Sequence, residues 1–193
     1  MMSTTIRSGF EPFMRALIFS FVFILSSTYW LTGCANESAA SASQKLKIIP
    51  ELQNLQTLGE QAREKNLPIL LAFGAEWCAF CHQLRDEVLN PMMLSGRYDG
   101  KYMYMRYVSL DDRNPIPGFD GRPIRKDQWG ESYGVDLTPT VLFIDGNGNE
   151  VAPRLVGIAN IELYAAMIHK ALNTAYNKMG NSLRIPAMPE DLD

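Results

Sequence analysis

The sequence predicts an α/β protein in which a central mixed sheet is flanked by helices on both faces. Short runs of strand-forming residues alternate along the chain with longer segments whose apolar residues recur at helical spacing. Two β-α-β units precede a strand hairpin and a last helix, and this order favours a mixed sheet between two helical layers.

Each element follows from a local pattern. Continuous apolar or β-branched runs indicate strands, and leucines three or four residues apart indicate helices. Asn90-Pro91 should end or kink the helix that contains it, because proline lacks an N–H group. Gly180 is the expected stop of the last helix. The expected elements are a short strand or leading segment at 48–50, a helix at 51–65, a strand at 68–73, a helix at 79–89, a strand at 102–108, a loop at 111–128, a short helix at 129–133, a strand at 140–144, a turn at 145–149, a strand at 150–156 and a helix at 161–172.

The N-terminal segment is typical of a targeting signal. Arg7 and Arg15 give a positive segment before an apolar stretch at 16–25. Leu31-Thr32-Gly33-Cys34, which follows, resembles the bacterial lipobox. The resemblance implies a signal peptide at 1–33, lipid on Cys34 and a flexible tether at 34–46, with the protein facing the periplasm. Ala35 after the cysteine favours the outer over the inner membrane. An uncleaved anchor helix or a plain signal peptide are the alternatives.

Composition limits the class of partner. The 193 residues carry a net charge of −3. They show no basic stripe, so nucleic acid is not expected as a partner. The folded domain is expected at 47–180, with a loose tail at 181–193.

The motif that carries chemistry is Cys78-Ala79-Phe80-Cys81, which follows Trp77 at a predicted strand-to-helix junction. A helix N-terminus presents unpaired N–H groups and a partial positive charge, and both favour a thiolate. Cys78, expected to be exposed, is the candidate nucleophile, and Cys81 is the candidate resolving thiol. An inert structural disulfide is the simpler alternative.

His82 extends the motif to Cys-x-x-Cys-His, which is also the attachment signature of c-type haem. Haem is therefore a rival interpretation, whereas a structural zinc site would need more ligands than this motif offers. We expect no metal and no cofactor. His82 and Glu76 are candidates for proton handling, although each could be a solvated flanking residue. His169 is expected on the surface.

Four segments together resemble the thioredoxin superfamily, over roughly residues 67–172. They are the strand that leads into Cys78 and Cys81, the segment 133–140 that contains Thr138-Pro139, the turn at 145–149, and Leu155-Val156-Gly157. The chain most resembles the envelope group of SoxW type or the C-terminal domain of DsbD. The resemblance implies a cis-proline at Pro139 opposite the cysteines, and a substrate groove formed by Trp77, Thr138 and Pro139.

The resemblance further implies a monomeric thiol-disulfide oxidoreductase of the bacterial envelope that acts on protein thiols and disulfides. The reducing direction is favoured, because the relatives draw on a membrane electron donor. A disulfide oxidase or isomerase, or a non-catalytic module such as a metallochaperone or cytochrome-maturation factor, are the alternatives. Ala72 stands where thioredoxins carry a buried Asp, which argues against a fast reductase. The dipeptide Ala79-Phe80 favours an intermediate reduction potential.

Overall fold

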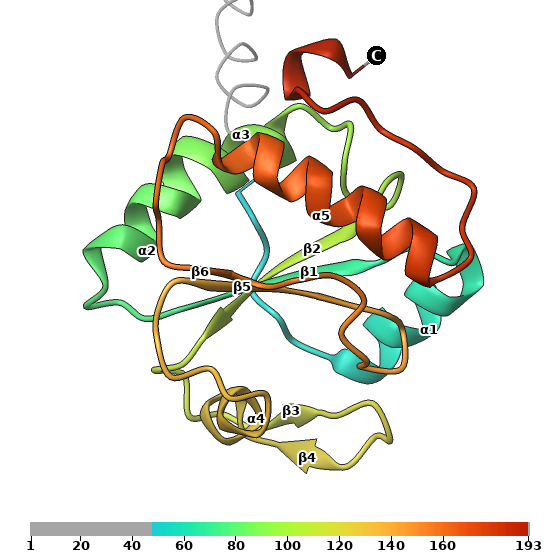
Figure 1. The fold of residues 1–193 in the computed structure, drawn as a ribbon. Coiled ribbons are helices and arrows are strands. Elements are labelled where there is room, and N and C mark those ends of the chain that lie inside the picture. The colour runs from blue at the N-terminus through green and yellow to red at the C-terminus, as the bar shows by residue number, and fades with distance from the viewer. Residues whose placement is uncertain (1–47, 193) are drawn as a thin grey trace, which may run out of the picture. The chain divides into compact units, whose positions relative to one another are not determined.

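A four-stranded mixed sheet forms the centre of the protein (Figure 1). The structure is a computed structural model, and it describes residues 48–192. The strand order is β2-β1-β5-β6. β1 (Ile69–Gly74) pairs in parallel with β2 (Tyr104–Ser109) and antiparallel with β5 (Thr140–Ile144), which pairs with the short edge strand β6 (Leu155–Val156). The predicted mixed sheet is confirmed.

Helices cover both faces of this sheet (Figure 1). Side chains of β1 alternate between two cores: Leu70 and Ala72 contact the core that contains residues of α2, α3 and α5, while Leu71 and Phe73 contact the core beside α1. The helices are α1 (Leu55–Lys65), α2 (Ala79–Leu84), a π-helical turn η1 (Arg85–Leu89), α3 (Asn90–Leu94), α4 (Lys126–Ser132), α5 (Tyr164–Lys178) and a 3-10 turn η2 (Pro189–Asp191).

The first helix begins later than its leucine pattern predicts. Asn54 is its N-cap, with the side-chain oxygen accepting a hydrogen bond from the Thr57 N–H at 2.9 Å. The preceding residues instead extend along the sheet edge, where Glu51 forms a parallel bridge with Tyr107. The segment at 48–50 is thus a leading segment of the sheet edge.

The helix that follows Cys78 does not stop at Asn90-Pro91, where an end or a kink was predicted. It continues through the π turn η1 into α3, and Pro91 lies in the first turn of α3. A wider π turn relieves the clash between a proline ring and the carbonyl one turn earlier. The proline therefore changes the helix type instead of ending the helix.

The segment 111–128, predicted as a loop, contains regular structure. Its strands β3 (Ile116–Pro117) and β4 (Pro123–Ile124) pair as a small hairpin, and α4 already begins at Lys126, so the short helix covers 126–132 and not 129–133. Pro117 and Pro123 lie on the two strands of this two-residue ladder, where few backbone donors are needed.

Lys126 anchors the segment 111–128, which we call the insertion, to the sheet. Its side chain is fully buried, and Nζ donates to Glu51 Oε1 at 2.7 Å and to Asp112 Oδ2 at 2.6 Å. Burial alone would lower the pKa of Lys126, but the hydrogen bonds to the two carboxylates outweigh it and raise the pKa. The hydrogen bond from Lys126 likewise lowers the pKa of Asp112.

His169 is fully buried, and its predicted surface position is wrong. Its Nδ1 lies 2.7 Å from the Pro186 carbonyl oxygen, to which it must donate, so Nε2 accepts from the Tyr98 hydroxyl at 2.9 Å. The bond to Pro186 also holds the C-terminal tail, which was predicted to be loose. The neighbouring Ile185 is buried and exchanges two hydrogen bonds with Asn173. The tail is part of the folded domain.

This network predicts a loss of stability in mild acid. Burial lowers the pKa of His169 below its ordinary value of 6.5, and the hydrogen bond to Pro186 and the charge of Glu190 offset only part of that effect. The unfolded chain therefore binds the proton first, and the free energy of unfolding falls as the pH drops through and below 6.5. The melting temperature of the wild type should decline over that range. His169→Gln, which can keep both hydrogen bonds, should decline less, and equal slopes for the two proteins would contradict the prediction.

The ends of the remaining elements follow local signals. Asp145 accepts hydrogen bonds from the backbone of Asn147 and Asn149, which closes the predicted turn. β6 is shorter than the expected strand at 150–156, with one isolated bridge from Glu150 to Ile144. α5 begins at Tyr164 and extends beyond 172, and Gly180 follows its end in a left-handed conformation, as predicted.

Within residues 48–192, no helix is long and apolar enough to span a bilayer.

Candidate active site

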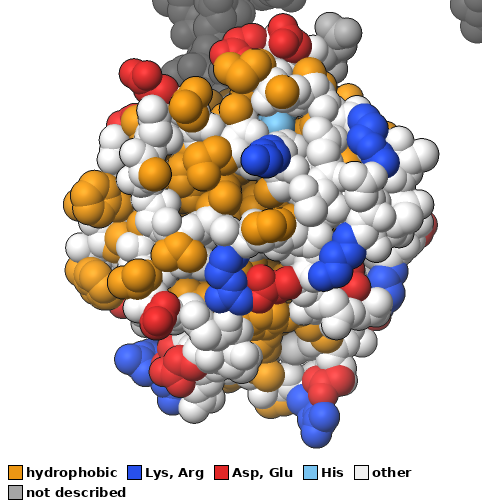
Figure 2. All heavy atoms as spheres, viewed as in Figure 1, with side chains coloured by type: hydrophobic (Ala, Val, Ile, Leu, Met, Phe, Trp, Pro, Cys, Tyr) orange, Lys and Arg blue, Asp and Glu red, His pale blue; other side chains and the backbone are white. Residues whose placement is uncertain are grey.

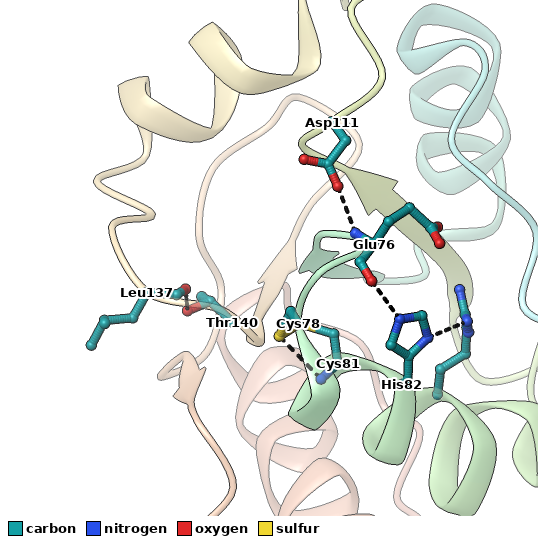
Figure 3. Close-up of a disulfide and its surroundings, with 8 residues drawn as sticks. Glu76, Cys78, Cys81, His82, Asp111, Leu137 and Thr140 are labelled. Carbon is teal, nitrogen blue, oxygen red and sulfur yellow. Dashed lines mark hydrogen bonds between the residues drawn. A yellow bond between two sulfur atoms is a disulfide. The ribbon is translucent and has the colours of Figure 1, made fainter.

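Cys78 and Cys81 are joined in a disulfide at the point where β1 leads into α2 (Figure 3). The two Cα atoms are 5.2 Å apart. Cys78 is the N-cap of α2, and its sulfur accepts a hydrogen bond from the Cys81 N–H at 3.2 Å. The predicted strand-to-helix position of the pair is confirmed, and the helix end offers this sulfur a backbone donor that would stabilise a thiolate.

Cys78 and Cys81 differ less in their exposed fraction than predicted. Cys78 was expected to be exposed, but only 6% of its surface is accessible, against 1% for Cys81. Cys78 remains the more accessible of the two. It is shielded because the cap position folds its side chain back over the first turn of α2.

The loop before Cys78 is held by two side chains from elsewhere. The Glu76 N–H donates to Asp111 Oδ2 at 2.5 Å, and the Glu76 carbonyl oxygen lies 2.8 Å from His82 Nε2 (Figure 3). Arg85 Nη2 donates to His82 Nδ1 at 2.7 Å, so Nε2 must carry the proton and donate to Glu76. Both ring nitrogens of His82 are thus engaged, which favours a role in positioning the loop over one in proton transfer.

Three large apolar side chains beside the disulfide are open to solvent. Trp77 is 78% exposed, Phe80 63% and Leu137 62%. Trp77 is therefore not packed in the core. We call these three residues the apolar rim. Apolar side chains also gather along the edge of the molecule over α2 and β6 in Figure 2.

The Thr138-Pro139 peptide bond is cis, as the resemblance implied. The residue after it, Thr140, pairs with Phe73 of β1 and lies on the opposite side of the disulfide from His82 in Figure 3. Thr140 Oγ1 donates to the Leu137 carbonyl oxygen at 2.8 Å, and the Pro139 carbonyl oxygen accepts from the Gly157 N–H at 2.8 Å. This segment borders the disulfide on one side, and the loop at Glu76 borders it on the other.

Two residues near the site had no recognisable signal in the sequence. Asp111 was one acidic residue in a predicted loop, and Tyr107 was one aromatic residue in a predicted strand. Tyr107 pairs with Ala72, and burial raises the pKa of its hydroxyl to about 12. Their importance depends on strand pairing and loop geometry, which a single sequence does not specify.

Among residues 48–192, no group of three or more His, Cys, Asp or Glu side chains is placed to hold a metal ion. Cys34 and the proposed signal peptide lie outside these described residues.

The fold and the site define a dithiol–disulfide protein of thioredoxin type. A family model described as a thioredoxin-like domain matches residues 55–172, and the chain belongs to this family.

Two curated relatives are thiol:disulfide interchange proteins DsbD. The one from Ralstonia nicotianae is 23% identical over 146 residues, which are 76% of this chain and 22% of the relative. The one from Vibrio vulnificus is 23% identical over 148 residues, which are 75% of this chain and 23% of the relative. The chain thus spans less than a quarter of either protein. Among solved structures, thioredoxin NaTrxh from Nicotiana alata is 21% identical, with a TM-score of 0.46 over 67% of this chain and 97% of that one.

Proposed function

We propose that the protein is a thiol-disulfide oxidoreductase that exchanges disulfides with protein substrates, in the reducing direction. The observation that carries this proposal is the Cys78–Cys81 disulfide at the start of α2, bordered by the cis Thr138-Pro139 segment. A dithiol at a helix N-terminus is suited to thiol-disulfide exchange, because one sulfur can be held as a thiolate.

The reaction has two exchange steps. The Cys78 thiolate attacks one sulfur of the substrate disulfide, forms a mixed disulfide and expels the other substrate sulfur as a thiolate. The Cys81 thiolate then attacks the Cys78 sulfur and expels the second substrate sulfur. Two electrons pass from the cysteine pair to the substrate, and a dithiol donor, which we place in the membrane, must reduce the pair again.

Several features shape the reactivity of the pair. Ala79 and Phe80 bring no polar side chain between the cysteines, so thiolate stabilisation depends on the helix end. We therefore propose an intermediate reduction potential. Glu76 is exposed and its side chain is available for proton exchange with water.

We further propose that the protein is anchored in the bacterial envelope and faces the periplasm, with the outer membrane favoured. This rests on the lipobox-like sequence that ends at Cys34 and on the tether at 34–46. The folded domain then begins near residue 47, and the ordered contacts of Ile185 extend it into the tail. Incorporation of labelled palmitate by the wild type, with none by Cys34→Ser, is the expected result.

The apolar rim should serve to bind protein substrates. Trp77→Ser should raise the KM for a protein disulfide by about tenfold, as expected when an exposed aromatic anchor is lost. Its reaction with a small aromatic disulfide should change little, because that reaction needs only the sulfurs. Leu94→Ser, at an exposed apolar position at the end of α3, is the matched control. If Trp77→Ser slows both reactions equally, the residue acts on the cysteine pair and not on binding.

The function is tested by following insulin reduction with the full chain in detergent and dithiothreitol as electron source. We expect the chain to accelerate the reduction over dithiothreitol alone. A chain that binds thiol proteins without accelerating their reduction would instead be a non-catalytic binding module. A visible spectrum with a strong haem band would overturn the proposal in favour of a cytochrome.

A further inference from the structure

The resolving step requires an ionised sulfur in a buried place. Only 1% of the surface of Cys81 is accessible, and its neighbours in the small cluster around the disulfide are Ala75 and Cys78. An apolar environment disfavours a thiolate unless a donor faces it. The structure therefore raises the question of which group stabilises Cys81 when it attacks.

The hydroxyl group of Tyr107 on β2 reaches this position. Tyr107 is in register with Ala72 of β1, and both side chains contribute to the same core. The next residue of β1 on that face is Gly74, which has no side chain. The Tyr107 hydroxyl oxygen lies 2.0 Å, and Cys81 Cβ 3.1 Å, from the point that a Cβ atom on Gly74 would occupy.

The space beside Gly74 is thus shared by the tyrosine hydroxyl and the resolving cysteine. A methyl group at Gly74 would overlap the hydroxyl, because Cβ atoms do not approach other heavy atoms to 2.0 Å. Ala72 leaves room on the same face for the ring of Tyr107. Two small residues on β1 therefore admit the hydroxyl to the side of Cys81.

We propose that the Tyr107 hydroxyl donates a hydrogen bond to the Cys81 thiolate during resolution of the mixed disulfide, an inference that rests on the proposed function. The stabilised thiolate attacks the Cys78 sulfur, the bond between Cys78 and the substrate breaks, and the substrate leaves as a thiolate. The proton of Cys81 passes to water, and Tyr107 keeps its own proton throughout.

The surroundings of Tyr107 suit a donor. Burial raises its pKa to about 12, so the hydroxyl keeps its proton at neutral pH. The guanidinium of Arg85 lies 5.4 Å from the ring centre and lowers that pKa, while the charges of Glu51, Glu76 and Asp111 raise it.

The test separates the two exchange steps with Ellman's reagent, a symmetrical aromatic disulfide. The reduced full chain in detergent carries Cys34→Ser, so that only the pair reacts. Attack by Cys78 releases one coloured thiolate, and resolution by Cys81 releases a second in an intramolecular phase. Tyr107→Phe should leave the first phase unchanged and slow the second about tenfold near neutral pH, since a hydrogen bond to a charged group is lost. The pH midpoint of the second phase should move upward by about one pH unit, and the two rates should converge at high pH.

Tyr176→Phe is the matched control. It also removes a buried hydroxyl, one that donates to the Tyr102 carbonyl oxygen at 2.6 Å, just before β2 begins. A second phase that Tyr107→Phe leaves unchanged at every pH would overturn the proposal, and so would equal slowing by both variants. A Cys34→Ser chain with Tyr107 intact that releases only one coloured thiolate would overturn the proposed function itself, and this failure is visible before any tyrosine is changed.

Discussion

Cys78→Ser should lower the rate of protein disulfide reduction by at least about a thousandfold, as expected when a nucleophile is removed from its machinery. The hydroxyl of serine does not ionise near neutral pH and cannot form a disulfide. Cys78 is the sulfur that caps α2 and receives the Cys81 N–H, and it is the more accessible of the pair. The initial rate of insulin reduction measures the loss.

Cys81→Ser is the matched variant, because it removes a sulfur from the same disulfide and leaves the nucleophile in place. It should also lose multiple turnover, but it should still attack once and accumulate a mixed disulfide with the substrate. Mass spectrometry of the trapped species, before and after reduction, would show the substrate on Cys78. If Cys78→Ser traps substrate and Cys81→Ser does not, the two roles are reversed.

The sheet and the redox pair could be predicted from the sequence because both follow from local patterns. The apolar runs of β1 and β5 give no alternation, as expected for strands buried on both faces. Cys78 and Cys81 lie three residues apart, so their proximity depends only on the start of one helix. The cis bond before Pro139 was predicted by resemblance, and no local pattern would have indicated it.

The errors share a physical cause, which is that long-range contacts override local composition. His169 and Lys126 are polar residues that composition assigns to the surface, yet both are fully buried because partners distant in sequence satisfy them. The segment at 111–128 looked irregular because its prolines and glycines dominate the local signal. Neither the ion pairs of Lys126 nor the approach of Tyr107 to Cys81 is visible before the strands are placed in register.

Lys126→Ala should lower the free energy of unfolding by about 3 kcal/mol, the lower end of the range for breaking a buried ion pair. Lys126 Nζ bridges Glu51, at the sheet edge, and Asp112, just after β2. Its removal leaves two carboxylates facing one cavity without a counter-charge. The two acidic side chains are 30% and 29% exposed, so water offsets part of the loss, which favours the lower end of that range.

The measurement is urea unfolding of the full chain in detergent. The midpoints are compared with the same dependence of the free energy of unfolding on urea concentration for each variant. Lys126→Met fills most of the volume without the charge, so it should lose less than Lys126→Ala, and the difference reports the cavity. Lys101→Ala, at an exposed position, is the matched control and should change stability by less than about 0.5 kcal/mol. If Lys126→Ala stays within that same limit, the bridge does not hold α4 to the sheet, and the insertion must be secured by its apolar contacts, such as that of Trp129 with Phe73.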